Sequence, residues 1–400
     1  MKTAIVIVNN LLRQDSPAAS IEMELLEELS GKGIRIIAFC SSLGTLNTPS
    51  QSYNTVIIKE SKIWKYIFAA IRFVLPDLLY LPDYHRWTCG RRMEKQIRKI
   101  LKKEKIDYIH SFSNECSCHL TALHLHRDFN IPWIATFFDS WTDEPSRKFV
   151  TGFFKEKDKK MEERVARNST AIVHNNKGIA NLWKKRYGEE IANKTKVIPL
   201  NVNFGKLKKG ILDKANKECV TISHIGTFYE HRDASVFIEA VNLFCKQYPQ
   251  LRKKIRVMFI GTVLNSDLAK IKKLNLIDIF DIKGRLPAEE CNQYYLNSDI
   301  FLSTAGLEFE KITFPSKIVK YLYFGKPILG ITPPETVMEL ELREAGHRCY
   351  TPSDLDGIVR YLYDAVTDYQ SLCDFNLDFW KKFSTDDIGR RYISLIDNLS

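Results

Sequence analysis

The alternation of short apolar runs with amphipathic helical segments is the feature that most constrains the fold of this chain. Near the start, Thr3–Val8 is a continuous apolar run, which is typical of a parallel strand covered on both faces. Ser16 and Pro17 then suit the cap and first turn of a helix, and Ile34–Phe39 is the next apolar run. This order predicts a βαβ unit with a right-handed crossover.

The alternation continues through two halves of the chain, which are separated by a polar, lysine-rich segment at residues 204–218. Further strands are expected at Tyr108–Ile109, Trp133–Phe137, Ala171–Val173, Val220–Ile225, Arg256–Ile260, Phe280–Ile282, Ile300–Ser303 and Pro327–Ile331. The sequence therefore predicts an α/β protein of two Rossmann-like, doubly wound parallel-sheet domains, at residues 1–203 and 204–384. Ligands of such sheets lie beyond the carboxyl ends of the strands, so we expect the domains to face a cleft.

Charge and cysteine usage narrow the classes of partner. The 400 residues include 59 Lys or Arg and 48 Asp or Glu, a formal charge of +11 that suits phosphorylated ligands, anionic membranes or nucleic acid. Nucleic acid is disfavoured because no zinc-finger spacing or RNA-binding signature accompanies the charge. The nine scattered cysteines and the absence of a signal-peptide pattern predict reduced thiols in a cytoplasmic protein, and Cys116 and Cys118 lack the second pair that a metal site needs.

The first candidate ligand-binding segment runs from Ser223 to Arg232, between an expected strand and an expected helix. A glycine at a strand end, here Gly226, lets the backbone of Gly226 and Thr227 approach a ligand closely. The following helix offers backbone N–H groups to an anion, and Arg232 adds a forked, permanently charged donor. Phosphate binding is the prediction, and a strand-end glycine beside a surface arginine is the alternative.

The second candidate segment is Thr313–Lys317, at the start of an expected helix that continues to Gly325. Pro315 suits the first helical turn, and Ser316 and Lys317 add a hydroxyl and an ammonium there. Oriented amides and a cation can together neutralise a leaving diphosphate without a metal ion. The alternative is a capped helix with a solvated lysine, but both segments follow strands of the same half, which favours a shared anion site.

Together these segments resemble the donor-binding domain of the retaining glycosyltransferases of family 4, which have the GT-B fold. The family has a glycine-rich strand end with a basic residue about six positions on, matched by Gly226 and Arg232, and a Phe-Pro-Ser-Lys helix start, matched by Phe314–Lys317. A further stretch containing Gly284 and Arg285 resembles the part of the family whose backbone usually meets the nucleotide base.

The first half resembles a branch of this family that makes bacterial surface polysaccharides. The matching stretches include Leu81–Asp83, His119–Leu120, Ile131–Ala135, Asp139–Thr142 and Pro199–Asn201. In relatives the final helix leaves the second domain, so residues 385–400 are expected to pack on the first. His119 and Asp139 are candidates to face the sugar or the acceptor, with packing and turn-capping as their respective alternatives.

The resemblance implies transfer, with retention, from a nucleotide-diphosphate sugar to a saccharide or lipid-linked acceptor, without a metal ion or other cofactor. In the family's usual front-face reaction the donor's own phosphate oxygen takes the acceptor proton, so the protein mainly orients substrates and stabilises the diphosphate. Arg232 and Lys317 are the predicted diphosphate ligands, helped by the amides of Gly226 and Thr227 and by the helix that begins at Pro315.

Several positions depart from the family pattern. Lys320 stands where relatives have the glutamate that holds the donor ribose, and a cation cannot accept hydrogen bonds, so either ribose recognition differs or Lys320 points at phosphate. Glu308 and Glu310 are candidates to substitute in part. Phe138 and Phe112 replace a common arginine and histidine. A nucleotide-sugar epimerase of the same fold, and a catalytically weak subunit of a polysaccharide assembly system, therefore remain open as alternatives.

Residues 62–92 interleave aromatic and basic side chains, which include Lys62, Trp64, Lys65, Tyr66, Arg72, Trp87 and Arg91. This composition suits an interfacial helix and predicts peripheral contact with the anionic inner face of the plasma membrane. The alternative is that the apolar residues Ile63, Ile67, Ile71 and Val74 face the core of the first domain. Charged residues and Pro76 interrupt this stretch, so we do not expect it to span a bilayer.

Overall fold

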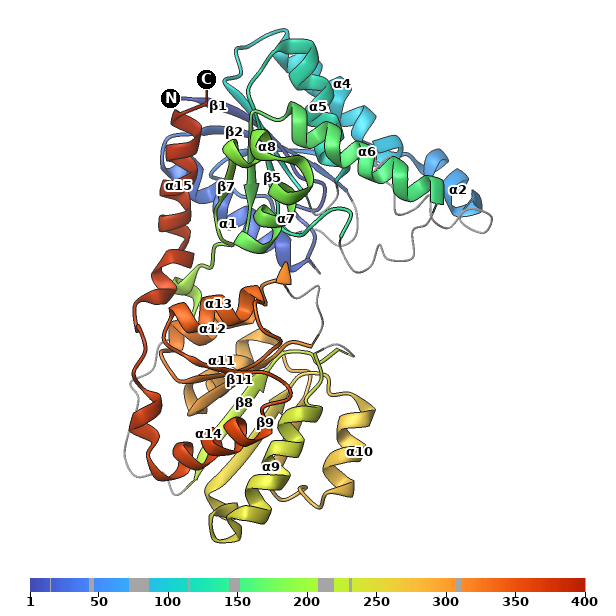
Figure 1. Cartoon of the computed structure of the whole chain (residues 1–400). Coiled ribbons are helices and arrows are strands. Elements are labelled where there is room, and N and C mark those ends of the chain that lie inside the picture. The colour runs from blue at the N-terminus through green and yellow to red at the C-terminus, as the bar shows by residue number, and fades with distance from the viewer. Residues whose placement is uncertain are drawn as a thin grey trace. The chain divides into compact units, whose positions relative to one another are not determined.

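A computed structural model describes residues 1–14, 16–42, 47–71, 86–113, 116–143, 152–207, 219–229, 232–306 and 311–399 (Figure 1). The chain divides into two compact units, Met1–Val202 with Lys382–Ser400, and Asn203–Lys381. Each unit is built on a parallel sheet covered by helices, which confirms the expected fold class. Residues 208–218 of the expected linker, together with Leu81–Asp83, Glu308 and Glu310, lie outside the described residues.

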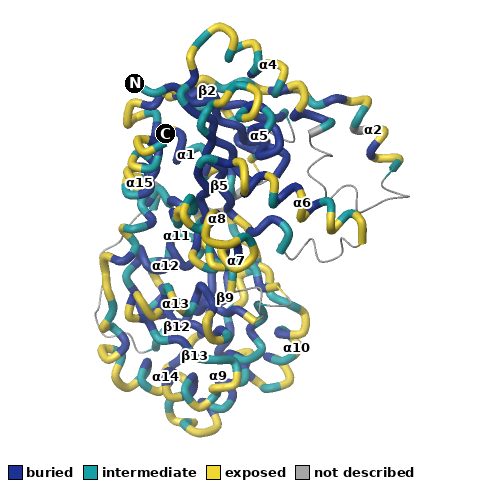
Figure 2. Tube along the Cα trace, turned by 45° about the horizontal axis from the view of Figure 1, so that its top comes forward, coloured by how far each residue is buried: buried dark blue, intermediate teal, exposed yellow. Residues whose placement is uncertain are grey.

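The sheet of the first unit has the strand order β3-β2-β1-β4-β5-β6-β7, and all neighbours are parallel. The strands are β1 (Thr3–Ile7), β2 (Arg35–Ser41), β3 (Asn54–Ile58), β4 (Tyr108–Phe112), β5 (Trp133–Phe137), β6 (Ala171–His174) and β7 (Thr195–Val197). Every residue of β1, β4, β5 and β6 is buried, as their mainly apolar sequences predict for strands covered on both faces. Figure 2 shows this buried sheet as the dark interior of the unit.

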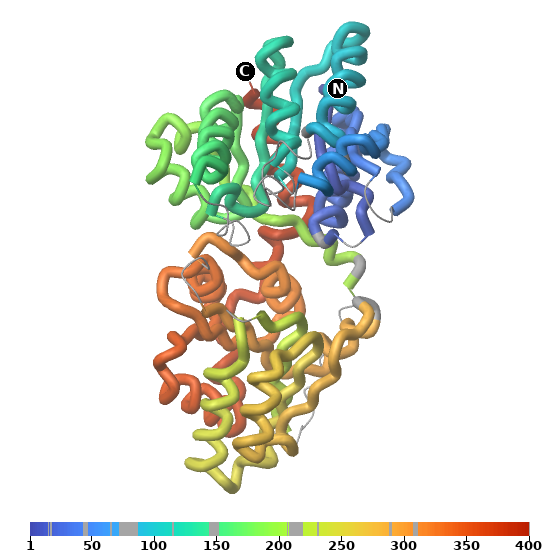
Figure 3. Tube along the Cα trace, turned by 90° about the vertical axis from the view of Figure 1, so that its right-hand side faces the viewer, coloured from blue at the N-terminus to red at the C-terminus, as the bar shows by residue number. Residues whose placement is uncertain are grey.

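The helices of the first unit are α1 (Pro17–Gly31), α2 (Lys62–Ile71), α4 (Arg91–Leu101), α5 (Ser117–Phe129), α6 (Gly152–Asn168), α7 (Lys177–Tyr187) and α8 (Glu189–Asn193), with a π-helical turn at Arg86–Gly90 before α4. The C-terminal helix α15 (Thr385–Asp397) also belongs to this unit, which holds both chain termini (Figure 3). It packs on α1, where Gly389 lies so close that a Cβ on it would be 2.6 Å from Glu28 Cγ. Ile388, Tyr392 and Ile396 of α15 complete the hydrophobic core.

The sheet of the second unit has the order β10-β9-β8-β11-β12-β13, again all parallel. Its strands are β8 (Val220–Ile225), β9 (Ile255–Ile260), β10 (Phe280–Gly284), β11 (Ile300–Thr304), β12 (Ile328–Ile331) and β13 (Arg348–Tyr350). Its helices are α9 (Ser235–Gln247), α10 (Asn265–Lys273), α11 (Ala288–Asn297), α12 (Lys317–Phe324), α13 (Val337–Glu344) and α14 (Leu355–Thr367), with 3₁₀ turns at Phe204–Lys206, Pro249–Lys254, Tyr369–Leu372 and Phe379–Phe383. The strand order reverses between β8 and β11, and ligands of open α/β sheets bind at such a switch point.

Among the helices described, none is both long enough and apolar enough to cross a bilayer.

Candidate functional site

A pocket of about 280 Å³ lies in the second unit, where β8, β9 and β10 end and α12 begins. It is lined by Ile225, Gly226, Thr227, Ile260, Gly261, Arg285, Leu286, Cys291, Tyr295, Ser316, Lys317 and Lys320. Six of the predicted donor-binding residues therefore come together, because the carboxyl ends of neighbouring parallel strands meet at one edge of a sheet.

The floor of the pocket is backbone from two adjacent strand ends. Gly226 and Gly261 have φ values of 145° and 133°, and the Gly226 N–H donates to the carbonyl of Ile260 at 2.7 Å. A Cβ on Gly261 would lie 2.2 Å from the Gly226 oxygen and 3.2 Å from the Thr227 nitrogen. Only glycine allows the two backbone segments to approach this closely, so the backbone conformation at Gly226 and Thr227 depends on Gly261.

Lys317 is held over this floor by a buried histidine. Its Nζ lies 2.9 Å from His224 Nε2, and the other ring nitrogen of His224 lies 3.1 Å from the Leu302 carbonyl oxygen. Burial, with the Lys317 charge as a second cause, lowers the pKa of His224 well below its usual value. The neutral ring therefore donates from Nδ1 to Leu302 and accepts from the ammonium at Nε2.

His224 is a site residue that the sequence analysis did not single out. It occupies the penultimate position of β8, its ring is fully buried, and it stacks on Phe228 with a centroid separation of 3.8 Å. The available signal is a histidine in the buried half of a strand, two residues before a strand-end glycine. The contact positions the Lys317 ammonium beside Gly226, because a Cβ on Gly226 would lie 3.6 Å from Nζ.

The charged side chains that line the pocket are all basic among the described residues. Arg285, Lys317 and Lys320 line it, and among the described residues no Asp or Glu does. Burial raises the pKa of the Cys291 thiol in the same pocket, and the nearby Lys320 charge partly offsets that effect. Three cations in one pocket favour an anion with more than one negative charge. The Gly226 N–H does not add to this charge, because it donates to the Ile260 carbonyl.

The helix that carries two of these cations, expected at Ser316–Phe324, begins at Lys317, one residue later. Pro315 instead forms a preceding turn, in which its carbonyl accepts from the Ile318 N–H at 3.0 Å. The Tyr321 hydroxyl anchors α12 to β8, since it accepts from the Ile225 N–H at 2.9 Å and donates to the Ile225 carbonyl at 3.2 Å. The ends of β8 and α12 are thereby fixed to one another.

Two other predicted donor-site residues lie beside the pocket. Gly284 supports its floor by accepting from the Gly261 N–H at 2.7 Å. Arg232 makes backbone contacts, with its N–H donating to the Tyr229 carbonyl at 2.8 Å and its carbonyl accepting from Thr304 Oγ1 at 3.3 Å. Arg232 is not among the described residues that line the pocket, so its role as a diphosphate ligand stays a prediction.

The first unit places its two candidates differently. His119 is fully buried, with Nδ1 2.8 Å from Ser111 Oγ and its ring 4.2 Å from that of Phe137. Burial lowers the pKa of His119 to about 3, so the ring is neutral. This placement fits the packing alternative and does not support a catalytic role. Asp139 is the second residue after β5 and is exposed, and its role stays a prediction.

The described residues contain no group of three or more His, Cys, Asp or Glu side chains that could hold a metal ion.

Sequence profiles place the chain among known enzymes. A profile described as Glycosyltransferase Family 4 matches residues 22–204, and one described as Glycosyl transferases group 1 matches residues 209–375. The chain therefore belongs to the GT-B glycosyltransferase superfamily. No curated protein sequence matches it.

Three solved structures illustrate the shared fold. Sucrose-phosphate synthase of Thermosynechococcus elongatus is 12% identical, with a TM-score of 0.69 over 100% of this chain and 99% of its own. HepE of Anabaena, in complex with UDP-glucose, is 12% identical, with a TM-score of 0.66 over 100% of both chains. WaaB, a lipopolysaccharide outer core galactosyltransferase in its apo form, is 12% identical, with a TM-score of 0.65 over 99% of both chains.

Proposed function

We propose that this protein transfers a sugar, with retention and without a metal ion, from a nucleotide-diphosphate sugar to a saccharide or lipid-linked acceptor in surface-polysaccharide synthesis. The observation that carries the proposal is the Lys317 ammonium, held by neutral His224 beside the backbone of Gly226. HepE with UDP-glucose supports the donor class, and WaaB supports the type of pathway.

The proposed chemistry rests on charge stabilisation. As the bond from the sugar to the diphosphate breaks, negative charge grows on the leaving phosphate, and donors fixed in advance stabilise it without reorganising. The Lys317 ammonium is such a hydrogen-bond donor, because His224 and the first turn of α12 fix its position before the nucleotide sugar binds. Lys320 lies one turn further along α12, where an ammonium can donate to a phosphate oxygen but cannot accept a hydrogen bond from a ribose hydroxyl, as a glutamate would.

A thermal-shift screen tests the donor class. Nucleoside diphosphates and nucleotide-diphosphate sugars at about 100 times their Kd are expected to stabilise the fold by about 2.7 kcal/mol, whereas nucleoside monophosphates at the same concentration stabilise it less. The ranking is expected to be unchanged by a chelator. If no diphosphate compound shifts the melting temperature, or if the shift requires a divalent cation, the proposal is wrong. Product analysis without acceptor separates transfer from epimerisation.

Membrane contact through α2 is a second part of the proposal. Ile63 and Tyr66 are 71% and 75% exposed, whereas Phe68 on the other side of the helix is buried. The outward face of α2 is thus apolar, and the alternative that Ile63 faces the core does not hold in the described part of this segment. Such a face beside basic residues suits the interface of an anionic bilayer.

Liposome flotation tests this contact. Wild type is expected to float with vesicles containing phosphatidylglycerol at low salt, and a variant with Lys62, Lys65 and Arg72 changed to glutamate is expected to remain in solution, because each cation contributes about 1 kcal/mol near such a surface. Residues 72–85 and the Lys65 side chain lie outside the described part. Equal flotation of variant and wild type, or none by wild type, contradicts the contact.

A further inference from the structure

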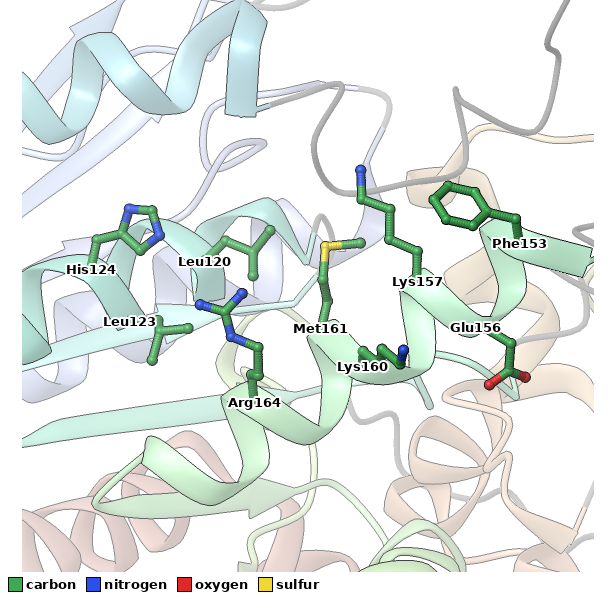
Figure 4. A pocket seen from close by; sticks show the side chains of 9 residues that line it. All are labelled: Leu120, Leu123, His124, Phe153, Glu156, Lys157, Lys160, Met161 and Arg164. Carbon is green, nitrogen blue, oxygen red and sulfur yellow. The ribbon is translucent and has the colours of Figure 1, made fainter.

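A second pocket, of about 350 Å³, lies in the first unit between α5 and α6 (Figure 4). It is lined by Leu120, Leu123, His124, Phe153, Glu156, Lys157, Lys160, Met161 and Arg164. No role in the proposed transfer reaction has been assigned to it.

The floor of this pocket is apolar. Leu120 and Leu123 of α5 and Met161 of α6 are buried, and Figure 4 shows the two leucines on α5 and Met161 on α6. Phe153, in the first turn of α6, lines the same pocket although its side chain is 76% exposed. A ligand with a hydrocarbon chain would cover this surface, which is stabilising by about 25 cal/mol for each Å² of apolar area removed from water.

The rim of the pocket is basic. Lys157, Lys160 and Arg164 are three and four residues apart, so they share one face of α6. In the part of the chain that the structure describes, neither the Lys160 ammonium nor the Arg164 guanidinium has a carboxylate partner. The Lys160 and Arg164 side chains are therefore available to an anionic ligand.

Glu156, Glu162 and Glu163 of α6 pair with cations other than Lys160 and Arg164. Glu156 pairs with Lys159 at 3.0 Å and points away from Lys157 in Figure 4. Glu163 pairs with Arg167 at 2.8 Å, and buried Glu162 pairs with Arg186 of α7 at 2.8 Å. The pocket therefore keeps an excess of positive charge over an apolar floor.

The pocket also lies toward the ligand-binding edge of the sheet. Leu120 is in the first turn of α5, which follows β4, and Phe153 and Glu156 are in the first turns of α6, which follows β5. Both helices begin on the side where their strands end, and ligands of such sheets bind at that side.

We propose that this pocket binds an anionic amphiphile, a phosphate ester carrying an apolar chain, with the phosphate on Lys160 and Arg164 and the chain on Leu120, Leu123 and Met161. The apolar floor gives a long-chain ester an advantage over a free phosphate, and the basic rim gives it an advantage over a neutral or cationic chain. This inference does not rest on the proposed transfer reaction, because the donor pocket takes no part in it.

Binding of monomeric decyl phosphate, measured by calorimetry below its micelle concentration, tests the proposal. Inorganic phosphate and decyltrimethylammonium are the comparison ligands. Wild type is expected to bind decyl phosphate at least about ten-fold more tightly than either, because only that ligand uses both the rim and the floor. Equal binding of the cationic chain, or of inorganic phosphate, overturns the proposal.

Matched variants assign the binding to this pocket. Lys160→Glu with Arg164→Glu is expected to weaken decyl phosphate binding at least about ten-fold, and exposed Phe153→Ser to weaken it without changing the melting temperature. The control, Lys155→Glu with Lys185→Glu, makes the same change of charge at exposed positions that do not line the pocket. If the control weakens binding as much as the pocket variant does, the proposal fails.

Two sources of such a phosphate ester are distinguished by flotation with phosphatidylglycerol vesicles. If the variant Lys160→Glu with Arg164→Glu loses decyl phosphate but still floats, the pocket takes single amphiphiles. If the variant loses both decyl phosphate binding and flotation, the ligand is a headgroup of the bilayer itself. Failure of wild type to bind decyl phosphate overturns the proposal in either case, and leaves the donor screen unaffected.

Discussion

Replacement of Lys317 by alanine is expected to lower kcat/KM for sugar transfer by about 30- to 1000-fold, which corresponds to about 2–4 kcal/mol of transition-state stabilisation. The ammonium lies beside Gly226 and is oriented by neutral His224, so its removal takes away a hydrogen-bond donor whose position was fixed before the reaction. The fold is expected to remain, because the Lys317 side chain is only partly buried. Steady-state kinetics with saturating donor, and the melting temperature, measure the two effects separately.

Two further variants make this result interpretable. Lys272→Ala removes an exposed lysine from α10 of the same unit and is expected to leave kcat/KM unchanged. Arg232→Ala is expected to weaken donor binding if the arginine reaches the diphosphate, as the family resemblance implies. Full activity of Lys317→Ala would remove Lys317 from the site, and full activity of Arg232→Ala would do the same for Arg232.

The sequence predicted half of the residues that line the pocket at the ends of β8, β9 and β10. Gly226, Arg285 and Lys317 are far apart along the chain, but each follows or faces the carboxyl end of a parallel strand. Because every such end lies at one edge of the sheet, the strand and helix pattern brings these residues together without knowledge of side-chain packing. The fold class follows from the same periodicity.

The side-chain contacts within each unit could not be predicted from the sequence in the same way. His224 meets Lys317 across 93 positions of sequence, and periodicity shows that His224 is in a strand but not which side chain faces it. The packing of His119 was unpredictable for a related reason. A lone histidine at the start of a helix looks the same in sequence whether it faces solvent or, as here, packs on Ser111 and Phe137. Only the packing of α5 on the sheet decides between the two.

Gly261 was missed although its signal resembles that of Gly226. Each glycine directly follows an apolar strand, but only Gly226 is followed by the basic residue of the family pattern. The importance of Gly261 comes from the close approach of the two strand ends, with a Cβ position 2.2 Å from the Gly226 oxygen. A distance of this kind has no trace in one sequence.

Replacement of Gly261 by alanine is therefore expected to have the largest effect on the second unit. The new methyl group would collide with backbone atoms of Gly226, which cannot rotate away as a side chain would, and φ at this position is 133°. Strain and overpacking together are expected to cost about 2–5 kcal/mol, a fall of about 5–15 °C in the melting temperature. Donor binding is expected to be lost, because the floor at Gly226 and Thr227 must move.

Two glycine variants separate the collision from the cost of the backbone conformation alone. Gly33→Ala has a φ of 92° but open space around its Cβ, so it is expected to cost only about 1 kcal/mol. Gly226→Ala has a φ of 145° and ordinary contact, 3.5 Å from Lys317 Cδ, so it is expected to fold and to weaken donor binding by crowding the lysine. If Gly261→Ala does not fold, Gly226→Ala still tests the floor. If Gly261→Ala melts like Gly33→Ala and binds donor like wild type, the close approach of the strand ends is wrong.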